Sequence, residues 1–179
     1  MTTESDVDTG PFLMVSLADD RAPGWPSPAR EDVATLTLDM SHKHHRGFWA
    51  MQLDEAARGM REPRVIVARG LACLAVVRWA QLSPKSYIEN IAGAVLFSPL
   101  SFTPAQATLA QALQPSPTLP LPFRSTVVEH RTSPLIEHLL ALVDCWGSRF
   151  VDVDDFATAG SAAPSATEPP ETPVVSLWA

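Results

Sequence analysis

The 179-residue sequence has little cysteine, little positive charge and no long apolar run. Its two cysteines, Cys73 and Cys145, form neither a CxxC pair nor the Cys/His spacing of a zinc site. Both lie in apolar helical stretches, so we expect two buried, reduced thiols. Lys and Arg total 13 against 20 Asp and Glu, a formal net charge of −7. That balance argues against a nucleic-acid backbone or an anionic membrane surface as the main partner.

No apolar run approaches the ~20 residues that a membrane-spanning helix needs. The first residues, "MTTESDVDTG", are polar and acidic, unlike the basic and apolar start of a signal peptide. We therefore expect a cytoplasmic protein. Three of the five histidines, at 42, 44 and 45, cluster in "SHKHHRG". No cysteine or carboxylate accompanies them at a ligand spacing, so we interpret them as a solvated loop and expect no metal and no cofactor.

Apolar residues make up 46% of the chain, enough for one domain with a sizeable core. Apolar runs and helical periodicity predict strands at 12–17, 33–38, 65–67, 92–97, 125–128 and 150–153, and helices at 48–60, 71–81, 104–113 and 135–146. This alternation predicts an α/β fold, a mostly parallel sheet with helices on both faces. We place this domain at 11–156, between a disordered acidic arm (1–10) and a Pro/Ala/Thr-rich tail (157–179).

Two helix starts carry their own signals. Thr103-Pro-Ala-Gln106 has a threonine cap, a proline at the first position and a glutamine at the third. Ser133-Pro134 predicts a serine N-cap for the helix that follows. Ligands of parallel α/β folds bind outside the carboxyl ends of the strands, so function is expected in the turns that follow Ala68, Ser98, Glu129 and Val153.

Four stretches come in the order and spacing of a known family: "VIVARGLACLAVVRWA", "AGAVLFSPLSF", "LPFRSTVVEHRTSP" and "WGSRFVDVDD". They resemble the small YdeN-like serine hydrolases, which include the retinoblastoma-binding serine hydrolase of animals. The similarity spans 33–155 and, more weakly, the strand at 12–17. It implies a three-layer α/β-hydrolase-like fold with a Ser-Asp-His triad.

The resemblance also implies where the triad would lie, and all three positions are changed. The family's turn Ala-His-Ser-Leu-Gly-Cys reads Ala-Arg-Gly-Leu-Ala-Cys here, which puts the serine position at Gly70. The aspartate position, in a pattern like Ser-Arg-Asn-Asp-Pro, is Ser133, and the histidine position is about Thr158. Because a triad acts as a unit, this degenerate set predicts that none of the three is catalytic.

Other groups near these positions have competing interpretations. Leu71 could still supply one backbone N–H of an oxyanion hole, but Asp19 and Asp20 would repel an oxyanion. Cys73 is best explained by packing behind the turn. Ser98, or a Ser133–His130 pair, could have replaced the nucleophile, although strand-end and helix-cap roles explain these hydroxyls.

Arg69 stands beside a glycine turn and a helix start, a combination that suits an anion. The alternative is an ion pair with Asp19, Asp20 or Asp155 that closes the cleft. At the far end, "PVVSLWA" is a compact apolar patch with Trp178 as its anchor. It could dock on a partner, fold back over its own domain, or have no role.

The main hypothesis is thus a pseudoenzyme, a catalytically inactive serine-hydrolase-like protein that serves as a binding, scaffolding or regulatory subunit for another protein. Its candidate binding residues are Arg69, Gly70, Leu71 and Trp178. One alternative is an active hydrolase or esterase with a relocated nucleophile or a site completed by another chain. Another is a drifting paralogue without a specific activity.

Overall fold

The structure is a computed structural model that describes residues 11–18, 33–40, 47–116 and 118–155. Its strands are β1 (Phe12–Leu17), β2 (Ala34–Leu38), β3 (Arg64–Arg69), β4 (Ile91–Phe97), β5 (Ser125–Glu129) and β6 (Arg149–Asp152). Its helices are α1 (Phe48–Gly59), α2 (Leu71–Leu82), α3 (Lys85–Ile88), the 3₁₀ helix η1 (Pro104–Gln106), α4 (Ala107–Ala112) and α5 (Ile136–Trp146). The predicted α/β class is confirmed.

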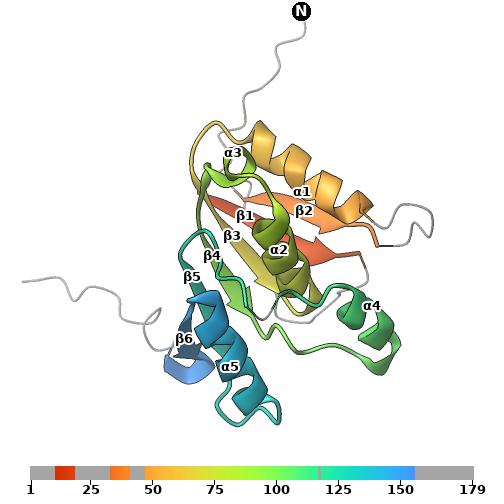
Figure 1. The fold of residues 1–179 in the computed structure, drawn as a ribbon, viewed down its shortest axis with the longest axis vertical. Coiled ribbons are helices and arrows are strands. Elements are labelled where there is room, and N and C mark those ends of the chain that lie inside the picture. The colour runs from red at the N-terminus through yellow and green to blue at the C-terminus, as the bar shows by residue number, and fades with distance from the viewer. Residues whose placement is uncertain (1–10, 19–32, 41–46, 117, 156–179) are drawn as a thin grey trace, which may run out of the picture.

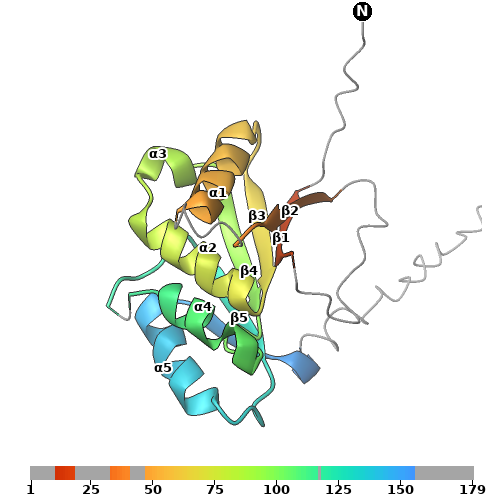
Figure 2. The ribbon, with the colours of Figure 1, turned by 90° about the vertical axis from the view of Figure 1, so that its right-hand side faces the viewer.

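The six strands form one parallel sheet in the order β2-β1-β3-β4-β5-β6 (Figure 1). From β2 to β6, each strand lies further toward the same edge of the sheet than the strand before it in the sequence. Only β1 lies between β2 and β3, so that connection crosses over one strand. Right-handed crossovers then place every intervening helix on the same face. Figure 2 shows α1 to α5 on that face. The sequence predicted helices on both faces, but all the helices of the described residues lie on this one.

The main core lies between this face of the sheet and the helices. α2 is buried on nearly all sides, as its continuous apolar sequence predicts, with nine of its twelve residues buried. Side chains from alternate strand positions meet it, including Val15, Ile66 and Leu96, each 0% exposed. Leu53 and Ala57 of α1 and Met60 directly after it are buried and form an apolar stripe at helical spacing.

The glutamine cap of the third predicted helix, at 104–113, is confirmed. The Gln106 side chain accepts a 2.9 Å hydrogen bond from the Thr103 backbone N–H, and the first turn is the 3₁₀ helix η1. The α3 turn was not predicted, because four residues are too few to show a helical period.

Two sequence-based predictions are wrong. Ser133 does not cap α5, whose N-cap is Leu135. A turn intervenes, in which the Ser133 N–H donates to His130 O and the Ser133 carbonyl accepts from Ile136 N. Cys145 is exposed rather than buried, since the inward stripe of α5 is formed by Leu139, Val143 and Trp146. Among the described residues, no helix is long and apolar enough to cross a bilayer.

Candidate functional site

The turn between β3 and α2 has the backbone shape of a strained strand-to-helix elbow. Gly70 sits there with φ 55° and ψ −132°, a conformation that glycine adopts without the penalty a Cβ would bring. Its N–H donates to Phe97 O at 2.9 Å, and its carbonyl accepts from Cys73 N at 3.0 Å. The N–H of Leu71 is at the start of α2 and therefore has no partner within the helix.

Cys73 is fully buried behind this elbow. Its thiol donates to the Phe97 carbonyl, with 3.4 Å between Sγ and O. The contact joins α2 to the end of β4, which supports the packing role that the sequence favours for this cysteine.

A second strained residue lies at the end of the neighbouring strand. Ser98 has φ 46°, the one positive φ among the described non-glycine residues. Its hydroxyl donates to Glu129 Oε1 at 3.4 Å, and the same oxygen accepts from His130 N at 2.9 Å. Glu129 is buried, so β4 and β5 end in a hydrogen-bonded serine–glutamate pair at the carboxyl edge of the sheet.

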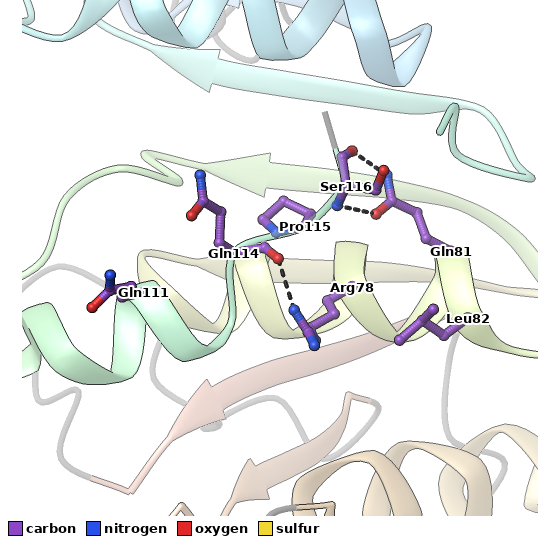
Figure 3. A pocket seen from close by; sticks show the side chains of 7 residues that line it. All are labelled: Arg78, Gln81, Leu82, Gln111, Gln114, Pro115 and Ser116. Atoms are coloured by element: carbon purple, nitrogen blue, oxygen red, sulfur yellow. Dashed lines mark hydrogen bonds between the residues drawn. The ribbon is translucent and has the colours of Figure 1, made fainter. Parts of the chain in front are cut away.

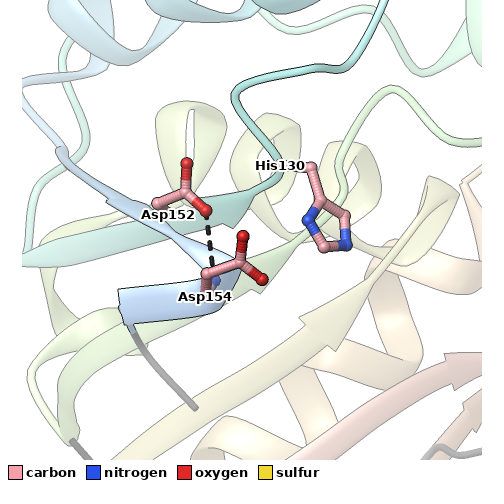
Figure 4. Close-up of side chains that lie close together, drawn as sticks. All are labelled: His130, Asp152 and Asp154. Atoms are coloured by element: carbon pink, nitrogen blue, oxygen red, sulfur yellow. Dashed lines mark hydrogen bonds between the residues drawn. The ribbon is translucent and has the colours of Figure 1, made fainter. Parts of the chain in front are cut away.

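Beyond this pair, His130, Asp152 and Asp154 lie together, with ligand-type atoms within 4.8 Å of one another (Figure 4). Buried Asp152 accepts from Asp154 N at 3.1 Å and from Arg131 N at 3.2 Å. Arg131 Nε also lies 3.3 Å from Asp152 Oδ2. The donor set has a metal-binding composition, but a guanidinium and two backbone N–H groups already satisfy its only buried carboxylate.

The sequence-based site residues do not all meet at this edge. Arg69 precedes the elbow, is half-buried and engages in an interaction of its own, and the strand register puts it on the face opposite the helices. Ser133 is in the turn before α5. Thr158 and Trp178 lie outside the described residues, as do Asp19, Asp20 and the histidines at 42, 44 and 45.

An apolar groove of about 280 Å³ lies near the elbow. It runs between α4 and α5 across the first turn of α2, and its apolar wall includes Leu74, Leu100, Phe102, Ala110, Leu135 and Leu142. His138 is exposed and lines the groove. The groove could not be predicted from sequence, because its wall comes from three helices and two loops.

A polar depression of about 520 Å³ lies further along α2 (Figure 3). The Gln81 amide donates to Ser116 O at 3.1 Å and to Leu119 O at 2.6 Å, and accepts from Ser116 N at 2.9 Å. Arg78 donates to Gln114 O at 2.8 Å. These groups fix the proline-rich segment before β5 onto α2, so the depression has a structural explanation.

Sequence reasoning missed the constellation of Glu129, His130 and Asp152. The signal available was that polar residues end both β5 and β6. What brings them together is the register, which pairs Glu129 with Asp152 across the two strands.

Comparisons with known proteins agree with the fold. The sequence model of the serine hydrolase family matches residues 25–160, more than half of the chain. No curated protein matches. Among solved structures, a YdeN-like hydrolase from Pectobacterium atrosepticum is similar in fold, with a TM-score of 0.53 and 17% sequence identity. The match covers 79% of this chain and 76% of that one. This chain therefore belongs to the serine hydrolase family.

Proposed function

We propose that this member of the serine hydrolase family does not hydrolyse through its elbow and acts as a binding, scaffolding or regulatory subunit. The observation that carries the proposal is Gly70. The turn has the strained backbone that presents a nucleophile in this fold, yet its central residue has no side chain. A hydroxyl, an imidazole and a carboxylate act together in triad catalysis, but Gly70 provides no side chain, and Ser133 and Thr158 provide neither a carboxylate nor an imidazole.

The surroundings of the elbow support binding. The groove between α4 and α5 is mostly apolar and lies one turn of α2 away from Gly70. Concave apolar surfaces of this kind hold ligands or side chains of a partner protein. Binding of this kind requires no covalent bond to be made or broken.

The chemistry is tested with the purified full-length chain and a fluorophosphonate probe. We expect no labelling, and p-nitrophenyl acetate turnover equal to that of buffer. Gly70→Ser serves as a matched variant and should also remain inactive, because the sequence has a threonine at the expected histidine position, about Thr158. Labelling of the wild type at any serine would contradict the proposal.

The binding role is tested by affinity purification from the native host. The full-length chain should retain a defined protein partner, and a chain that ends at residue 159 tests the contribution of the tail. Equal recovery with both chains would remove the tail from this role, and a full chain that retains nothing above background would contradict the binding function.

A second candidate is hydrolysis by a relocated nucleophile, and Ser98 is the observation that favours it. Its backbone is strained, its hydroxyl contacts a buried carboxylate, and an imidazole lies on the adjacent loop. On this alternative, Ser98→Ala removes all fluorophosphonate labelling, whereas Ser133→Ala leaves it unchanged. The wild-type result separates the two functions before any variant is needed.

A further inference from the structure

The apolar groove between α4 and α5 presents large apolar side chains to solvent. Phe102 and Leu135 line it and are 38% and 46% exposed, while Leu74 of α2 lines its buried side and is 4% exposed. Exposed apolar side chains grouped around a hollow mark a binding surface. The volume of about 280 Å³ equals that of about nine water molecules of ~30 Å³, so the groove can hold one apolar chain of similar size.

The groove adjoins the polar depression shown in Figure 3. Gln111, Gln114 and Pro115 line both hollows. On α2, Leu74 lines the groove and Arg78, four residues later, lines the depression. Residues four apart on a helix are neighbours, with about 5–6 Å between their Cβ atoms. A guanidinium therefore lies one helical turn beyond the apolar wall of the groove.

Arg78 has no carboxylate partner among the described residues. The chain has a net charge of −7, yet no Asp or Glu in the described part of the chain lines either hollow. The one side-chain hydrogen bond that Arg78 makes there runs from Nη1 to the Gln114 carbonyl, at 2.8 Å. A guanidinium has five N–H donors and binds a carboxylate through two parallel hydrogen bonds. In Figure 3 the second terminal nitrogen of Arg78 points away from Gln114, so donors remain for an anion.

We propose that the two adjoining hollows bind a medium-chain carboxylate, with its apolar chain in the groove and its acid group at Arg78. The chain lies against Leu74, Phe102 and Leu135, and the carboxylate accepts from the guanidinium. A small amphiphile fits better than a helix of a partner protein, because the groove has room for only about nine non-hydrogen atoms. The inference rests on the non-hydrolytic binding role proposed above and names the class of ligand that this site takes.

The test uses octanoate as the probe and octanol as its neutral match. The ¹⁵N-labelled full-length chain is titrated with each probe at pH 8, where octanoate is ionised, and the backbone N–H resonances of Ala110 and Gln114 are followed. Octanoate should shift both resonances to saturation. It should bind about tenfold more tightly than octanol, because the carboxylate adds a charge-assisted hydrogen bond.

Two variants separate the head of the ligand from its chain. Arg78→Gln should remove the preference for octanoate while octanol binds as it does to the wild type. A loss of affinity for both probes would instead show that Arg78 acts only by holding Gln114, and would overturn the head-group assignment. Ala107→Trp fills the groove from an exposed position on α4 and should abolish binding of both probes. Ala112→Trp, exposed on the same helix but outside the groove, is the matched control and should bind as the wild type does.

Other outcomes would also overturn the proposal. They are equal affinity of the wild type for the two probes, no saturable binding, and octanoate binding that survives in Ala107→Trp. Resonances of the free chain that shift over a tenfold dilution would assign the groove to a second copy, because association obeys mass action. Protection of the same N–H groups by a purified partner protein, without octanoate binding, would assign it to that partner.

Failure of this inference is distinguishable from failure of the proposed function. A chain that resists the fluorophosphonate probe and does not bind octanoate contradicts the ligand assignment alone. A chain that is labelled by the probe and also binds octanoate at Arg78 contradicts the proposed function alone.

Discussion

The indole nitrogen of Trp79 donates a 2.7 Å hydrogen bond to Oδ1 of Asp54. This bond joins α2 to α1, and Trp79 is almost completely buried. Asp54→Ala leaves the buried N–H without its acceptor, so we expect a loss of about 1–3 kcal/mol in the free energy of unfolding, measured by urea denaturation. Asp54→Asn retains an oxygen acceptor and should lose less. Exposed Glu55, the next residue of α1, serves as a control. If Glu55→Ala lost as much unfolding free energy as Asp54→Ala, the hydrogen bond to Trp79 would not explain the loss.

Gly93 is required by the close approach of β4 to the segment before β5. A Cβ at this position would lie 2.9 Å from the backbone oxygen of Arg124, which accepts from Ala94 N. Gly93→Ala should therefore destabilise the protein by about 1–3 kcal/mol in thermal or chemical unfolding. Gly59→Ala, at the end of α1 with nothing within 4 Å of the new Cβ, should be stabilising by roughly 0.4–1 kcal/mol. Effects of the same sign would contradict the steric explanation.

The backbone of Gly70 provides a separate prediction. Because φ is 55° there, Gly70→Ala forces a Cβ into a conformation that costs of order 1–3 kcal/mol. Gly47 is the matched control, since it also precedes a helix but has φ −113° and open space around a Cβ. In calorimetry, Gly70→Ala should lower the melting temperature more than Gly47→Ala. Equal melting temperatures would mean that the elbow is not strained.

Gln81 fixes the proline-rich segment to α2 through three hydrogen bonds. Gln81→Ala removes all of them, and we expect a loss of about 1–2 kcal/mol together with faster hydrogen exchange at Ser116 N. Gln111 lines the same depression from α4, and Gln111→Ala should change stability by less than about 0.5 kcal/mol. Unchanged exchange at Ser116 in Gln81→Ala would show that other contacts hold the segment.

Asp152 is assigned to an ion pair and turn rather than to a metal site. Asp152→Asn should cost about 1–3 kcal/mol, because the carboxylate accepts from Arg131 and from Asp154 N. Asp154→Asn removes an exposed carboxylate and should change stability by less than about 0.5 kcal/mol.

The same assignment predicts how the protein responds to divalent cations. A cation bound by His130, Asp152 and Asp154 would raise the melting temperature by mass action. We expect no rise when zinc or manganese is added to chelator-treated protein. A rise that His130→Ala and Asp154→Asn both abolish would establish a metal site instead.

Much of the fold could be predicted because local patterns and global packing agree. Short apolar runs separated by helical stretches predict a parallel sheet, since both faces of the central strands β3 and β4 are apolar. The stripe on α1, the buried α2 and the Thr103–Gln106 cap depend on neighbours within a few residues, so each is visible in the sequence. The predicted arm, tail and cytoplasmic location remain predictions.

Other features depend on contacts between distant segments. The start of α5 shifted because a turn through Ser133 precedes it, and Cys145 is exposed because the inward stripe of that helix excludes it. The groove beside α2 and the Ser98–Glu129 contact exist only once β4, β5 and the helices are assembled.

By itself the sequence determined a parallel α/β domain with a glycine at its strand-to-helix elbow. The first feature follows from the spacing of apolar residues along the chain, and the second from the identity of residue 70. Only the tertiary structure decided that polar ends of β5 and β6 meet, that Asp152 is paired with Arg131, and that the helices of the described residues lie on one face. These outcomes depend on strand register and crossover handedness, which relate residues far apart in the chain.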